Sequence, residues 1–227
     1  MKQVYFWALV FSAFCFAACS KKSDVKPTTD PRVGTVSIGG YNYATIIIGT
    51  QTWTSVNYSQ GTGSLAKADA TYGNYYTLAQ AQAISLPTGW RIPTVADYNK
   101  LMATFTAASQ TTSGNYAGDI SVARALADTG LFHSLDSFGQ TLKATNSSGF
   151  DAYAGGVYNT GNQTFVEQQI GAAFLTSTTA TLYGATVNYF FGIASDNVPI
   201  GNSTQAYYVG IDNYTGYAYS LRFVKDN

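Results

Sequence analysis

The sequence predicts a domain of the α+β class, because its strand-like and helix-like segments lie in separate parts of the chain. Apolar and polar residues alternate within residues 35–57 and again after residue 141, whereas the stretch between them has helical spacing. Strands and helices do not alternate regularly, as they do in a doubly wound α/β sheet, and no repeat of fixed period is visible. A length of 227 residues allows one domain, or at most two.

Residues 1–18 are predicted to be a secretory signal, because Lys2 precedes an apolar run that is too short to span a membrane. The sequence Phe-Ala-Ala-Cys at residues 16–19 resembles a bacterial lipobox, in which small residues precede a cysteine that is lipidated and becomes the mature N-terminus. Cys15 leaves with such a signal, so Cys19 is the only thiol that remains. We expect a lipid anchor at Cys19; an ordinary cleaved signal is the alternative.

Residues 19–34 are predicted to be a solvated tether, since they carry lysines and prolines and few apolar side chains. Five of the twelve basic residues and two of the twelve acidic ones fall in residues 1–32. The rest of the chain therefore has seven basic and ten acidic side chains. A mildly acidic body is a poor nucleic-acid binder, because phosphate contacts need clustered lysine and arginine. The expected location is the outer membrane, on either of its faces, with residues 35–227 as one domain.

Residues 35–57 are predicted to form a meander of three short strands. Gly39-Gly40 and Gly49-Thr50 interrupt runs of β-branched and aromatic residues at the spacing of hairpin turns.

Three helices are predicted next. The first covers residues 78–85. The second begins at Thr94, whose side chain can cap the helix while Asp97 reaches back to the cap amide. Its apolar residues follow one helical stripe: Tyr98, Leu101, Met102 and Phe105. The third covers residues 120–129, with Gly130 as its C-cap.

Five further strands are predicted at residues 150–158, 172–177, 187–195, 205–212 and 217–224. In the last strand, alternation places Tyr217, Tyr219, Leu221 and Phe223 on the buried face and Ala218, Ser220 and Arg222 on the outer face.

The sequence offers few groups for catalysis. His133 is the only histidine, and no G-x-S-x-G elbow is present to supply a nucleophilic serine. A glycosidase needs two converging carboxylates, which Asp151, Glu167, Asp196 and Asp212 could supply only if the fold brings two of them together. Asp196 and Asp212 could also offer oxygens to calcium, although Asp-Asn pairs more often build turns. We expect no enzyme activity, no cofactor and no metal.

Aromatic side chains are the better candidates for binding, because apolar sugar faces pack on flat rings while amides and hydroxyls bond the rim. Most of the aromatic residues must form the core, and Trp53 and Trp90 are expected to be structural. Tyr208 is predicted to face outward from its strand, Tyr214 lies at a turn tip and Tyr158 at a strand end. These three tyrosines are the predicted ligand contacts.

Several sequence blocks occur in the order typical of one family. They are Tyr-Gly-Asn-Tyr-Tyr at residues 72–76, Leu-Pro-Thr-Gly-Trp-Arg-Ile-Pro-Thr at 86–94, Ser-Gly-Phe-Asp-Ala at 148–152, Phe-Leu-Thr-Ser-Thr at 174–178 and Ser-Leu-Arg-Phe-Val-Lys-Asp at 220–226. The chain thus resembles the FISUMP domain, the Fibrobacter succinogenes major paralogous domain of bacterial lipoproteins and secreted proteins. Phe223 stands where that family usually has a cysteine. The resemblance implies a fold akin to C-type lectins and formylglycine-generating enzymes, and it brings no catalytic residues.

Together these observations predict a lipid-anchored envelope protein whose domain binds without catalysis, with a glycan or another surface polymer as the first expectation. A structural or protein-interaction role in an envelope assembly is the alternative. The membrane, through the lipid, and a polysaccharide or envelope protein are the expected partners.

Overall fold

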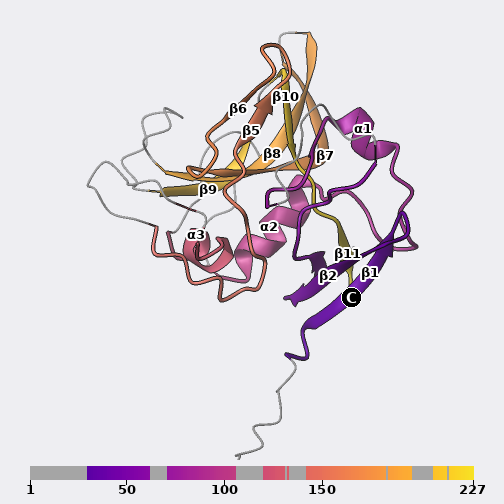
Figure 1. Cartoon of the computed structure of the whole chain (residues 1–227), viewed down its shortest axis with the longest axis vertical. Helices are drawn as coiled ribbons and strands as arrows, with labels where there is room; N and C mark the ends of the chain where they lie inside the picture. The colour runs from indigo at the N-terminus through magenta and orange to yellow at the C-terminus, as the bar shows by residue number, and fades with distance from the viewer. Residues whose placement is uncertain are drawn as a thin grey trace, which may run out of the picture.

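The N-terminal meander forms as its turn residues predict, and a strand from the end of the chain pairs with it as a fourth strand. The computed structural model describes residues 30–61, 71–105, 120–130, 132, 142–182, 184–195, 207–213 and 215–227. The first sheet has the order β1 (Val33–Ile38), β2 (Tyr41–Ile48), β3 (Gln51–Thr54) and β11 (Val224–Asp226). β11 pairs antiparallel with β3, so that the C-terminus ends beside this sheet (Figure 1).

The second sheet collects strands from the rest of the domain. Its order is β6 (Thr164–Val166), β5 (Val157–Asn159), β10 (Tyr217–Ser220), β7 (Ala172–Leu182), β8 (Ala185–Ser195) and β9 (Tyr207–Asn213), and β4 (Tyr75–Tyr76) also pairs with β10. The β7–β10 pair is parallel and the other pairs are antiparallel. Strands and helices are segregated as expected, and the architecture is α+β.

Three helices are described: α1 (Leu78–Gln82), α2 (Val95–Ala103) and α3 (Ile120–Leu126). The predicted capping box at α2 is confirmed, since Thr94 accepts from the Asp97 amide and Asp97 accepts from the Thr94 amide. The prediction that Gly130 caps the third helix is wrong. α3 ends at Leu126, three positions before the predicted end at residue 129, and the next residue, Ala127, forms a parallel bridge with Ala152.

The core lies where α2 meets both sheets (Figure 1). Tyr98 of α2 is fully buried and stacks on Phe191 of β8, with ring centroids 4.4 Å apart. Its other neighbour is Trp53 of β3, at 5.0 Å, which confirms the structural role expected for that tryptophan. The predicted stripe of α2 is therefore the surface that joins the two sheets.

Two of the predicted C-terminal strands are shorter or divided in the structure. Of residues 150–158, only the end forms β5, and the preceding residues run irregularly. Residues 217–224 are divided between β10 and the start of β11, with Leu221–Phe223 crossing from one sheet to the other. None of the helices in these described ranges is long and apolar enough to cross a lipid bilayer.

The outer face predicted for the last strand is also wrong, because both faces of this crossing are covered. Ala218, Ser220 and Arg222 are each no more than 1% exposed. The Arg222 side chain donates to the carbonyls of Phe150, in the irregular segment before β5, and of Thr54, at the end of β3. A charged side chain is thus placed in the interior.

Candidate functional site

A polar cavity of about 520 Å³ opens beside the first sheet, and it is the candidate site. Its wall includes aromatic, amide, hydroxyl and carboxyl groups: Asn42, Tyr43, Asn57, Ser59, Asp128 and Tyr153. These residues come from β2, from the chain after β3, from the end of α3 and from the irregular segment before β5. Thr71 and Gly73, before β4, also line it, so the cavity exists only where five segments meet.

Gly73 allows two of these segments to approach closely. Its φ is +75°, and a Cβ at this position would lie 2.9 Å from the Cβ of Asn57. The neighbouring carbonyl of Tyr72 accepts from Asn57 Nδ2 at 2.7 Å. Any side chain at position 73 would therefore push the Asn57 wall away from this segment.

Arg222 lies behind the cavity and holds its wall together. Its Nε donates to Asn57 Oδ1 at 2.5 Å, Nη1 donates to the carbonyls of Thr54 and Phe150 at 2.9 and 2.8 Å, and Nη2 donates to the Asp151 carbonyl at 2.7 Å. Its guanidinium also lies over aromatic rings: Phe150 at 5.0 Å, Phe174 at 5.4 Å and Tyr153 at 5.7 Å. Burial lowers the pKa of Arg222 to about 10, so the group is charged at neutral pH.

Two carboxyl groups meet at one side of the cavity. Asp128 lines it, and the charge of Asp128 acts on the nearby carboxyl group of Asp151. Asn146 Nδ2 donates to Asp151 Oδ1 at 2.9 Å, and the Asp151 amide donates back to Asn146 Oδ1 at 3.0 Å. Burial raises the pKa of Asp151, and the charge of Asp128 raises it further, whereas the Tyr153 hydrogen bond and the Arg222 charge lower it.

The raised pKa of Asp151 predicts that Asp151→Asn stabilises the protein at neutral pH. A group whose folded pKa lies above its unfolded pKa destabilises the folded state at high pH, and this effect fades as pH falls to the unfolded pKa. Urea unfolding of both proteins between about pH 3 and 8 measures the difference, which we expect to shrink below about pH 4. An advantage of the variant that grows toward acid pH would contradict the assignment.

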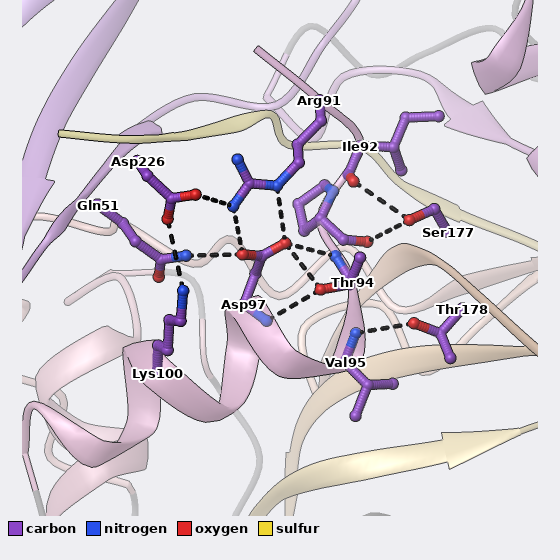
Figure 2. Close-up of polar contacts among 11 residues, drawn as sticks. Gln51, Arg91, Ile92, Thr94, Val95, Asp97, Lys100, Ser177, Thr178 and Asp226 are labelled. Atoms are coloured by element: carbon purple, nitrogen blue, oxygen red, sulfur yellow. Dashed lines mark hydrogen bonds and ion pairs between the residues drawn. The ribbon is translucent and has the colours of Figure 1, made fainter. Parts of the chain in front are cut away.

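A second polar cluster, around Asp97, is a structural clasp (Figure 2). Arg91 donates to both Asp97 oxygens at 2.6 and 3.2 Å, and Gln51 Nε2 donates to Asp97 Oδ1 at 2.8 Å. The Thr94 amide and hydroxyl donate to Oδ2, both at 2.8 Å. Burial alone would raise the pKa of Asp97, but the hydrogen bonds from Arg91 and Thr94 outweigh it and lower that pKa.

Asp226 extends this clasp to the C-terminal strand. Its carboxylate lies 2.9 Å from Arg91 Nη2 and 3.6 Å from Lys100 Nζ of α2. Three segments are thereby tied together: β11, the start of α2 and the chain before it (Figure 2). Because Asp97 already accepts from three residues, the clasp is suited to holding the fold.

The structure contradicts the exposure expected for one of the three predicted ligand tyrosines and does not describe the side chains of the other two. The exposed ring predicted at Tyr158 is wrong: the side chain is 4% exposed, because β6 folds back and places Phe165 over it at 5.1 Å. In β9, the backbone of Tyr208 pairs with Ala194 of β8, and the Tyr208 side chain is not among those described. Tyr214 lies outside the described residues, as do Cys19, His133 and Asp196.

The residues that line the cavity were not singled out in the sequence, whereas Asp151, next to Asp128, was named there among four candidate carboxylates, and two sequence signals mark the residues behind the wall. Arg222 interrupts an otherwise apolar alternation, which marks either a surface or a buried charge. Asp151 belongs to the Ser-Gly-Phe-Asp-Ala block and adopts a positive φ of 59°. Among the described residues no group of three or more histidine, cysteine, aspartate or glutamate side chains is arranged to hold a metal.

A family profile described as the Fibrobacter succinogenes major domain matches residues 46–225, which is most of the chain. The chain belongs to this family. The match confirms the resemblance carried by the sequence blocks. The Fibrobacter succinogenes major domain here runs from within β2 to within β11, and it includes the Asp97 clasp, Arg222 and the Asp128–Asp151 pair. No curated protein and no solved structure matches the chain.

Proposed function

We propose that this Fibrobacter succinogenes major domain is the binding module of a lipid-anchored envelope protein, and that it takes up a saccharide in the cavity without transforming it. The composition of the cavity wall supports this proposal. Tyr43 and Tyr153 offer rings, while Asn42, Asn57 and Ser59 offer amide and hydroxyl groups. Sites for small ligands commonly combine apolar or aromatic walls with a few convergent polar groups.

The proposed anchor is the lipidated Cys19, joined to the domain by the tether of residues 19–34. The sequence alone supports this part of the proposal, through the apolar run and the Phe-Ala-Ala-Cys sequence. Lipid chains contribute about 0.8 kcal/mol per buried methylene, so more than one chain on Cys19 anchors stably. The expected location is the outer membrane, facing the periplasm or the cell surface.

We also propose that the α+β fold is of the C-type-lectin-like kind. Two observations support this assignment: the N-terminal and C-terminal strands meet in one sheet, and helices pack against antiparallel strands. In such an arrangement irregular segments outside the strands supply the binding surface, as the chain after β3 and the segment before β5 do at this cavity.

The placement of the carboxyl groups favours binding over glycoside hydrolysis. A glycosidase holds its two carboxyl groups about 5 Å apart or more, because they act from different positions around the scissile bond. The Asp151 carboxyl group lies near enough for the charge of Asp128 to raise its pKa, and Asp151 is not among the described residues that line the cavity. The two carboxyl groups form a single acidic group at one side of the cavity.

A glycan array followed by calorimetry tests the proposal, with the full chain purified in detergent. We expect at least one oligosaccharide to bind, and Asn42→Ala to weaken it by about tenfold through loss of a rim hydrogen bond. Asn162→Ala, at the exposed turn between β5 and β6, is the matched control and should bind like the wild type. Absence of binding by any glycan at millimolar concentration would refute the proposal.

The alternative is a structural or protein-interaction role, and the first sheet gives a specific reason to keep it. β1 is an edge strand, and Val33 and Tyr41 are each 53% exposed on this sheet. An unpaired edge with apolar side chains is a surface suited to another protein. A stoichiometric partner that copurifies from membranes, together with no glycan binding, would favour this role.

A further inference from the structure

The charge that a ligand can reach in the cavity is negative. Asp128 is the charged residue among those lining it in the described parts of the chain. We propose that the cavity selects saccharides that carry a protonated amine over neutral or anionic ones, with Asp128 as the ion-pairing group. This inference rests on the proposed function, since it names the chemical class of saccharide for the same site.

Asp151 reinforces the negative charge but is held by the protein. Its Oδ1 accepts from Asn146 Nδ2 at 2.9 Å. Asp128 has one described hydrogen bond, from the Gly130 amide to Oδ1 at 2.8 Å, at an exposed position. An ammonium group in the cavity would therefore meet Asp128 directly, with the charge of Asp151 adding to the attraction.

Arg222 does not provide a site for an anionic sugar, although it lies close behind the wall. Its side chain is 0% exposed, and all three of its nitrogen atoms donate to protein acceptors. A uronic acid would find no accessible cation among the described lining residues, and it would be repelled by the two carboxylates.

Two tyrosine side chains, Tyr43 and Tyr153, also line the cavity. The Tyr43 side chain is 5% exposed, and its hydroxyl has no hydrogen-bond partner of ordinary geometry among the described residues. The nearby Ser59 lowers the pKa of this hydroxyl, against the larger effect of burial, but is not placed for a well-formed bond. Because that hydroxyl oxygen is itself buried, a ligand would contact the Tyr43 and Tyr153 side chains through their rings, which favour a cation beside them.

Calorimetry with three oligosaccharides of matched length tests the inference: glucosamine tetramer, N-acetylglucosamine tetramer and tetragalacturonate. With the full chain in detergent, we expect the free-amine tetramer to bind about tenfold more tightly than the acetylated one, and tetragalacturonate to bind more weakly than both. Raising the salt concentration from about 50 to about 300 mM should reduce the preference for the amine.

Asp128→Asn should bring the amine preference to within about twofold, because it weakens binding of the free-amine tetramer more than binding of the acetylated one. Asp226→Asn removes an acidic charge that does not line the cavity, and it should keep the preference. Equal binding of the amine and acetylated tetramers, or a preference that survives Asp128→Asn, would overturn the inference alone. Failure of all three tetramers, with no other glycan bound, would overturn the proposed function as well.

Discussion

Replacing Arg222 with methionine should lower the free energy of unfolding by about 3–5 kcal/mol. Methionine fills much of the same space, so the loss comes mainly from four buried oxygens that lose their donor: Asn57 Oδ1 and the carbonyls of Thr54, Phe150 and Asp151. A buried acceptor without a partner costs about 1–3 kcal/mol. Chemical denaturation monitored by tryptophan fluorescence gives the value.

The matched control for Arg222 is Arg32→Met. Arg32 pairs with Asp30 at 2.8 Å, but both side chains are substantially exposed, at 44% and 39%. An exposed pair of this kind contributes about 1 kcal/mol or less. If Arg222→Met lowers the free energy of unfolding by no more than Arg32→Met does, the Arg222 guanidinium is not what holds the segments around the cavity together.

Asp97→Ala is expected to lower the free energy of unfolding by about 3–4 kcal/mol. It removes the capping interaction of α2, and it also leaves buried donors without an acceptor. The side chain is 4% exposed and accepts from Gln51, Arg91 and Thr94. Asp97→Asn keeps the shape but loses the charge, and it should cost about 2–3 kcal/mol. Asp226→Asn, at a carboxylate that is 53% exposed, should cost less than about 1 kcal/mol.

The pH dependence of Asp97→Asn has a definite sign. The folded pKa of Asp97 lies below its ordinary value of 3.8, so the ionised carboxylate stabilises the folded state above that pH. This contribution is lost as pH falls through the lowered folded pKa. The stability gap between wild type and variant should therefore be widest at neutral pH and close in strong acid. A gap independent of pH would show that the charge of Asp97 adds nothing.

Local sequence was sufficient for features that depend on neighbouring residues. The α2 capping box needs only Thr94 and Asp97, three positions apart, and the structure forms it as predicted. The first hairpins follow from glycine at Gly39, Gly40 and Gly49, which all adopt positive φ. The stripe of α2 is buried because its spacing places the apolar side chains on one helical face. Each result concerns residues within one turn or one hairpin.

Alternation of apolar and polar residues does not show whether both faces of a strand are buried, because that depends on which distant segment of the chain packs over each face. Arg222 alternates like an exposed residue, yet residues 54–57 and 150–151 enclose it. Tyr158 ends a strand as an exposed residue would, yet β6 covers it with Phe165. The cavity itself joins segments more than 100 residues apart in sequence, from Asn42 to Tyr153. Sequence established the α+β class, the local turns and caps, and the family, because these depend on composition, order and short spacing. Tertiary packing alone decided which polar groups are buried together, because that depends on long-range chain crossings.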